Sequence, residues 1–231
     1  MSPGQPASAE PPRIAVLDYG IGNLRSAEKA FAHLGAESML TADAAMVAEA
    51  DAVVLPGVGA FGPCREALAR SGLDEVALDA VASGRPFLGI CVGMQLLYDS
   101  SEESPGIGGL GVLPGVVRRL PEGVRTPQMQ WNRLQPRTES PLLDGLGDAP
   151  WMYFVHSYAP EVTADAVATC EYGGPVTALA ARNNVMATQV HPEKSSDGGL
   201  ALLANFVHLA VGWREVGDAE PIAETTQSRA R

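Results

Sequence analysis

Short apolar runs alternate with segments of helical periodicity through the first half of the chain. Three runs have the length of buried strands: Arg13–Leu17, Ala52–Leu55 and Pro86–Ile90. The segments that follow them carry apolar residues at helical intervals, which is typical of amphipathic helices. Strands that alternate with helices in this way favour a parallel sheet that is covered on both faces.

The expected helices have recognisable ends. The first has its apolar face at Leu24, Ala27, Phe31 and Leu34, with Asn23 as a candidate N-cap and Gly35 as a stop. Further helices are expected at Cys64–Arg70 and at Leu73–Val81, and another is expected to begin at Met94–Tyr98.

The second half has a different pattern, dominated by short strands. They are expected at Val116–Leu120, Trp151–Val155, Val167–Tyr172, Val176–Ala181 and Val185–Val190. Asn183-Asn184 is suited to a hairpin turn between the last two, so antiparallel pairing is predicted here. A last apolar stripe predicts a helix at Gly199–Trp213. The fold class is therefore α/β, with a mostly parallel central sheet flanked by helices and antiparallel strands in the second half.

Composition narrows the class of protein. Residues 1–12 and 214–231 are polar and lack periodicity, so we expect disordered ends around one domain at 13–213. The net charge of −11 argues against nucleic-acid binding, because phosphate contacts need a basic surface. No apolar run is long enough to span a membrane, and the first residues do not resemble a signal peptide. Three cysteines far apart favour neither disulfides nor a metal site, so a reducing cytoplasm is expected.

The pentapeptide Gly89–Gly93 carries the sharpest chemical signal. Its central residue, Cys91, stands between glycines at the junction of a strand and a helix. Such a run predicts a tight turn that lifts the nucleophile above the sheet, and the helix amides favour a thiolate there. The same pattern also fits a buried cysteine of the core.

Two further segments supply the groups that a thiolate nucleophile needs. His191 follows a strand, and Glu193 can orient the ring of this general base. The Pro56–Gly59 loop follows another strand, and its amides at Val58 and Gly59 could join that of Val92 in an oxyanion hole. Taken singly, the first segment also fits an ordinary loop and the second an ordinary turn.

Together these motifs identify the chain as resembling the class I, or triad, glutamine amidotransferases. Within that family it resembles the glutaminase subunits of imidazole glycerol phosphate synthase. The resemblance runs from about Arg13 to Trp213 and is carried by the segments 18–24, 56–61, 89–97, 129–132, 153–158 and 189–195. It implies a glutaminase that passes ammonia to a cyclase subunit in histidine biosynthesis. That cyclase is a (β/α)₈ barrel of about 250 residues, too long for the segment after 213, so a heterodimer is expected.

The resemblance also implies roles for individual residues. The catalytic set is Cys91, His191 and Glu193. The L-glutamine substrate is expected to contact Gly57, Gly59, Gln95, Glu103, Ser157 and Tyr158. The partner interface is expected to include Asn23, Trp131, Asn132, Tyr153 and Lys194. No cofactor and no metal is implied.

This chain departs from the family pattern at a few positions. Gln128 and Gln130 stand where the family commonly has His and Gly, and Val190 stands where it usually has Phe. Three other readings remain: the glutaminase of pyridoxal phosphate synthesis, a freestanding thiol hydrolase, and a catalytically inactive docking module. The segments around Trp131 and Tyr153 argue against the first, and the complete triad argues against the last.

Overall fold

The computed structural model describes residues 10–217. The central sheet has eight strands in the order β2-β1-β3-β4-β13-β12-β11-β8. The strands of its parallel half are β1 (Arg13–Leu17), β2 (Glu37–Thr41), β3 (Ala52–Gly57), β4 (Phe87–Cys91) and β13 (Val185–Thr188). Its antiparallel half continues through β12 (Pro175–Arg182), β11 (Ala166–Glu171) and β8 (Gln135–Pro136). The α/β class and the change from parallel to antiparallel pairing are as the sequence predicts.

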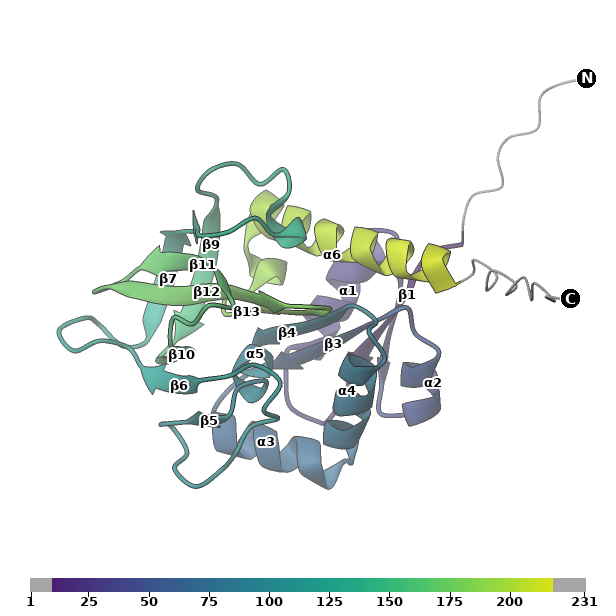
Figure 1. The fold of residues 1–231 in the computed structure, drawn as a ribbon, viewed down its shortest axis with the longest axis horizontal. Helices are drawn as coiled ribbons and strands as arrows, with labels where there is room; N and C mark the ends of the chain where they lie inside the picture. Colours follow the sequence, from purple (N-terminus) through teal and green to yellow (C-terminus); the bar gives the residue numbers. More distant parts are fainter. Residues whose placement is uncertain (1–9, 218–231) are drawn as a thin grey trace, which may run out of the picture.

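Helices cover both faces of the parallel half. Figure 1 shows α1 and α6 on one face and α3 and α4 on the other. The helices are α1 (Leu24–His33), α2 (Ala44–Ala48), α3 (Phe61–Arg70), α4 (Leu73–Ala82), α5 (Val92–Leu96) and α6 (Ser196–Gly217). Two single-turn 3₁₀ helices span Pro141–Leu143 and Pro192–Lys194. None of the helices within residues 10–217 is long and apolar enough to cross a membrane.

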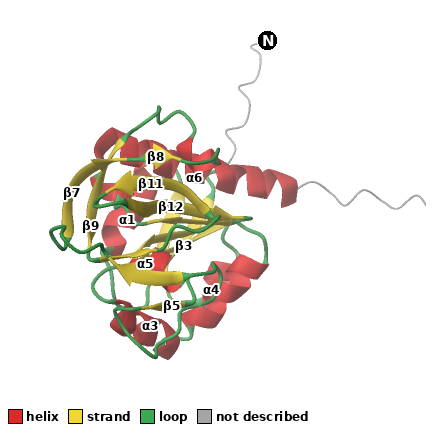
Figure 2. Ribbon diagram, turned by 60° about the vertical axis from the view of Figure 1, so that its left-hand side comes forward, coloured by secondary structure: helices red, strands yellow, loops and turns green. Residues whose placement is uncertain are grey.

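Two small sheets stand beside the central one. The first has the order β10-β6-β5, formed by β10 (Tyr158–Pro160), β6 (Val116–Arg119) and β5 (Ser100–Ser101). The second is a two-stranded ribbon of β7 (Gln128–Arg133) and β9 (Trp151–His156), which we call the β7–β9 ribbon. Figure 2 shows this ribbon curving past β11 at the end of the molecule away from α4.

The structure corrects the expected limits of two helices. The helix expected at Met94–Tyr98 is instead α5, which begins directly after Cys91 and ends at Leu96. Helix α6 continues past the expected boundary at 213, and its Arg214 donates to the carbonyl oxygens of Glu10 and Pro11. This contact fastens the C-terminal helix to the segment that enters β1. The remainder of the expected disordered ends, 1–9 and 218–231, lies outside the described residues.

Candidate active site

Cys91 is the last residue of β4 and stands at a strained turn. Its φ of 56° lies in the left-handed region, which costs a non-glycine residue roughly 1–3 kcal/mol. The glycines around it are required by contact: a Cβ on Gly93 would overlap the carbonyl oxygen of Leu55, and one on Gly89 would lie 2.9 Å from the Gly93 oxygen. The chain can therefore turn sharply from β4 into α5 and leave the thiol at the carboxyl edge of the sheet.

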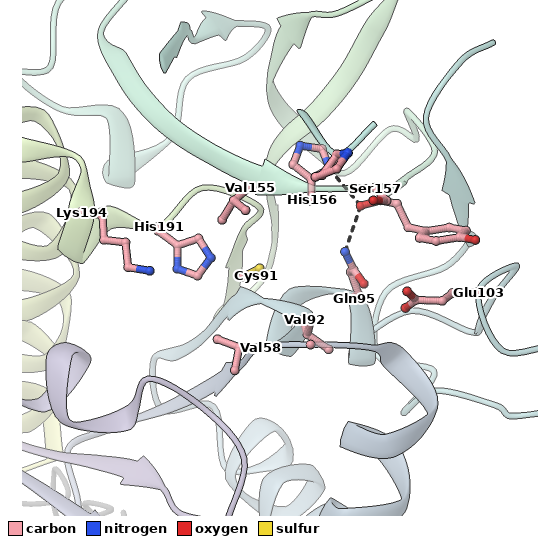
Figure 3. A pocket seen from close by; sticks show the side chains of 13 residues that line it. Val58, Cys91, Val92, Gln95, Glu103, Val155, His156, Ser157, His191 and Lys194 are labelled. Carbon is pink, nitrogen blue, oxygen red and sulfur yellow. Dashed lines mark hydrogen bonds between the residues drawn. The ribbon is translucent and has the colours of Figure 1, made fainter. Parts of the chain in front are cut away.

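His191 and Glu193 reach the same edge from the neighbouring strand. Strand β13 runs parallel to β4 and ends at Thr188, so the residues after it emerge beside Cys91. The Nδ1 of His191 lies 2.9 Å from Oε1 of Glu193, and the two side chains are only 4% and 5% exposed. In Figure 3 the imidazole faces the sulfur of Cys91.

The electrostatics of His191 favour its protonated form. Burial lowers the pKa of the imidazole. Hydrogen bonding to Cys91 and to Glu193 raises the pKa by a larger amount, and the net result is a pKa of about 9. A protonated ring beside the Cys91 sulfur can act as a general acid at that position. His191 is therefore prepared to donate a proton to a departing group.

A cavity of about 350 Å³ opens in front of the sulfur. This volume lies within the range of small-molecule sites. The lining residues are Val58, Gly59, Cys91, Val92, Gln95, Glu103, Pro127, Val155, His156, Ser157, Tyr158, His191 and Lys194. The cavity thus gathers most of the residues predicted from the sequence, and Figure 3 shows them arranged around Cys91.

One wall of the cavity carries backbone donors. Within residues 10–217, the N–H groups of Val58 and Gly59 have no hydrogen-bond acceptor, and Val92 begins a helix whose first amides lack partners within the helix. The loop is held from behind. The hydroxyl of Tyr19 donates to the Pro56 oxygen at 2.7 Å, and the thiol of Cys64 donates to the Val58 oxygen at 3.2 Å. An oxyanion could therefore accept hydrogen bonds from these amides once they face the cavity.

Another part of the cavity lining is polar and partly preorganised. Gln95 donates from Nε2 to the Tyr158 carbonyl and to Oε1 of Gln189, both at 3.0 Å. Glu103 accepts from the Phe61 amide at 2.7 Å, which fixes its carboxylate at the cavity edge. A carboxylate here suits an ammonium group, and the amide and hydroxyl groups suit a carboxylate or carboxamide.

Sequence reasoning missed two residues of the site. Gln189 is fully buried, and its Nε2 lies 3.7 Å from the Cys91 sulfur. Its position two residues before His191 was the available signal, because alternate residues of an extended segment point the same way. His156 donates from Nδ1 to the Tyr158 oxygen at 3.0 Å. Burial lowers its pKa to about 4, so the ring is neutral near pH 7.

The outer face of the β7–β9 ribbon joins the mouth of the cavity. Met129, Trp131 and Trp151 are 62%, 45% and 57% exposed on this face. Trp131 packs edge-to-face on Tyr153 with ring centroids 6.0 Å apart. Val155, on the same face, lines the cavity itself. Large exposed apolar side chains grouped in this way mark a binding surface.

The remaining predicted residues lie elsewhere. Asn132 points from the other face of the ribbon and donates to the Glu171 oxygen at 2.9 Å, so it ties the ribbon to β11. Asn23 shares a second, small cavity with Gly57, His191 and Glu193. Gly57 does not line the main cavity, and a Cβ at this position would lie 2.8 Å from both the Gly93 amide nitrogen and the Tyr19 hydroxyl oxygen. The expectation that Gly57 contacts substrate through this cavity is therefore not met.

Comparison with known proteins agrees with this geometry. The family model for class-I glutamine amidotransferases matches residues 15–210. A protein of Methanothermobacter thermautotrophicus named imidazole glycerol phosphate synthase subunit HisH is 48% identical, over 85% of this chain and 98% of that protein. Its namesake in Salinibacter ruber is 47% identical, over 84% of this chain and 93% of that protein. A solved glutamine amidotransferase superimposes with a TM-score of 0.69 at 23% identity, over 86% of this chain and 98% of that one.

Proposed function

The chain belongs to the class-I glutamine amidotransferase family, and from this premise we propose that it is the glutaminase subunit of an imidazole glycerol phosphate synthase. It hydrolyses glutamine to glutamate and ammonia in the cytoplasm and delivers the ammonia to a cyclase subunit. The observation that carries the proposal is the strained Cys91 turned toward a buried His191–Glu193 pair at the floor of a cavity.

Acylation follows from the positions of these groups. The Cys91 sulfur attacks the carboxamide carbon of glutamine, and the carbonyl electrons move to oxygen. Amides at Val58 or Gly59 and at Val92 stabilise that oxyanion, a contribution of roughly 3–4 kcal/mol per donor in comparable enzymes. His191 then gives its proton to the nitrogen, the C–N bond breaks, and ammonia leaves a thioester behind.

Deacylation uses the same groups in reverse. Water gives a proton to the neutral His191 and attacks the thioester carbon. The C–S bond breaks, the electron pair returns to sulfur, and glutamate departs. Glu193 takes no proton in either half, because its task is to hold the ring and stabilise the imidazolium.

Ammonia transfer requires that the partner cover the mouth of the cavity. The outer face of the β7–β9 ribbon supports this arrangement, because its aromatic residues run up to the cavity edge at Val155. Trp131 and Tyr153 would pack against the cyclase, and Lys194 would face it from the other side of the opening. Tyrosine, tryptophan and methionine are enriched in protein interfaces of this kind.

We expect the isolated chain to be nearly idle, since a free glutaminase would waste glutamine. The glycines around Val58 let the loop amides turn away from the cavity, and binding of the cyclase and its substrate would shift the population toward the competent loop.

The test compares glutamine hydrolysis by the chain alone, with the cognate (β/α)₈ cyclase, and with cyclase plus its ribonucleotide substrate. Formation of imidazole glycerol phosphate from glutamine only in the complete mixture is the expected result. Equal hydrolysis by the chain alone would instead favour a freestanding thiol hydrolase. Stimulation by a pyridoxal phosphate synthase subunit in place of the cyclase would favour that other amidotransferase.

A further inference from the structure

A buried chain of amides connects the substrate side of the cavity to the nucleophile. The Tyr158 carbonyl accepts from Nε2 of Gln95, whose same nitrogen donates to Oε1 of Gln189. Nε2 of Gln189 then lies 3.7 Å from the Cys91 sulfur. Both glutamines are almost fully buried, at 3% and 0% exposure. The dashed line that leaves Gln95 in Figure 3 is the first of these hydrogen bonds.

The orientation of each amide in this chain follows from its first member. A backbone carbonyl can only accept hydrogen bonds, so Gln95 must turn its NH₂ group toward Tyr158. The same NH₂ group faces Gln189, so Gln189 must accept this hydrogen bond with its side-chain oxygen. The NH₂ group of Gln189 is thereby directed at the sulfur. Nδ1 of His156 also donates to the Tyr158 oxygen, so the carbonyl itself is held in place.

We propose that Gln189 is a further functional residue of the site, which presents a fixed N–H donor to the Cys91 sulfur. This inference rests on the proposed function, because the proposed mechanism assigns Cys91 as the nucleophile. A donor at this position stabilises the thiolate that begins acylation. It also stabilises the same thiolate when the C–S bond of the thioester breaks and the electron pair returns to sulfur. Gln95 acts as the positioning residue that prevents the Gln189 amide from turning its oxygen to the sulfur.

The first test measures the reactivity of the sulfur directly. Cys91 is alkylated with iodoacetamide between pH 5 and pH 10, and the modified peptide is followed by mass spectrometry in wild type, Gln189→Met and Gln189→Glu. Loss of a hydrogen bond to a charged group corresponds to roughly a tenfold change, so the midpoint of alkylation should rise by about one pH unit in Gln189→Met. It should rise further in Gln189→Glu, which keeps the acceptor for Gln95 but turns a carboxylate oxygen to the sulfur.

The chain supplies a matched control for these variants. Gln128 is also fully buried, and its Nε2 lies 3.7 Å from the sulfur of Cys170, which does not line the cavity. Gln128→Met removes the same kind of contact at a cysteine without a base beside it. We expect Gln128→Met to leave the alkylation midpoint of Cys91 unchanged, while a purely structural effect of losing a buried glutamine would move it.

A second variant tests the direction of the hydrogen bonds between the two glutamines and leaves Gln189 itself unchanged. In Gln95→Glu the new carboxylate can only accept, so Gln189 should turn its NH₂ group to residue 95 and its oxygen to the sulfur. The alkylation midpoint should again rise, although Gln189 is intact. Near-UV circular dichroism checks that each variant is folded. An unchanged midpoint in Gln189→Met and Gln95→Glu would overturn the proposal, and it would do so even if the wild-type complex hydrolyses glutamine as proposed.

Discussion

Two buried cysteines of this protein each have a glutamine side chain as a neighbour, but the rest of their environments differ. Cys91 and Cys170 each lie 3.7 Å from the amide nitrogen of a buried glutamine. Cys91 ends a central strand at a strained turn and lines a cavity opposite His191. Cys170 lies within β11, and burial there raises the pKa of its thiol to about 11. One glutamine donor is therefore insufficient to make a cysteine reactive.

The difference between the two regions lies in topology. At the carboxyl edge of β3, β4 and β13, three chain segments end side by side and each brings one kind of group: loop amides, the thiol, and the imidazole. Cys170 lies in an antiparallel strand that continues into a hairpin, and its neighbours are β12 and the ribbon. The carboxyl ends of neighbouring parallel strands lie at the same edge of the sheet, so the residues that follow them are brought together into one site.

Replacing the sulfur of Cys91 or of Cys170 by oxygen should give the largest difference in glutamine-dependent activity. Cys91→Ser should abolish glutamine-dependent synthesis, because serine lacks an accessible anionic form beside His191. The complex should still form product from ammonium salts. Cys170→Ser should keep full glutaminase activity and lose about 1–2 kcal/mol of unfolding free energy, since a hydroxyl replaces a thiol in an apolar setting. Persistent glutamine-dependent turnover in Cys91→Ser would show that the nucleophile lies elsewhere.

Within the site, His191 and Glu193 should contribute unequally. In the proposed mechanism His191 moves a proton in both half-reactions, whereas Glu193 only orients the ring. His191→Asn should therefore lose roughly one hundredfold more kcat than Glu193→Gln. Steady-state glutaminase assays of the complex measure both values. Equal losses would mean that the two roles are assigned wrongly.

The turn itself can be compared with an exposed helical glycine. Gly93→Ala should lower the unfolding free energy by at least about 3 kcal/mol, because its Cβ meets the Leu55 carbonyl and neither backbone can move freely. Gly212→Ala, at an open position on α6, should raise it by up to about 1 kcal/mol through helix propensity. Chemical denaturation measures both changes. A tolerated Gly93→Ala would show that the elbow is less tightly packed than its contacts indicate.

The parts of the molecule that the sequence predicts best are those with local signals. Strand β1 and helix α1 follow from apolar periodicity and the Gly35 stop, and the elbow follows from its paired glycines. Strand β7 was missed, because a two-stranded ribbon with exposed tryptophan and methionine has no buried alternation on its outer face. The link from Tyr158 through Gln95 to Gln189 was also missed, since it joins residues 94 positions apart and depends on tertiary contacts alone.

Two histidines of the cavity extend the comparison to pH. The pKa of His156 is lowered by burial to about 4, while the pKa of His191 is raised to about 9 by its hydrogen bonds to Cys91 and Glu193 in spite of burial. His156 therefore adds stability above about pH 6.5 that is lost as the pH falls through 4. His191 adds stability that is complete below about pH 6.5 and is lost as the pH rises through 9.

Replacing either histidine by glutamine should weaken the pH dependence of the unfolding free energy, on the acid side for one residue and on the alkaline side for the other. The shift of His156 from 6.5 to about 4 corresponds to about 3 kcal/mol, lost gradually on acidification, so His156→Gln should reduce the acid-side slope of unfolding free energy. His191→Gln should instead reduce the alkaline-side slope and leave the acid side as in wild type. Urea unfolding between pH 4 and pH 10 measures both slopes. If both variants changed the same side, the two rings would not have opposite charge states near pH 7. The reason for proposing His191, and not His156, as the donor of the proton to the departing nitrogen would then be lost.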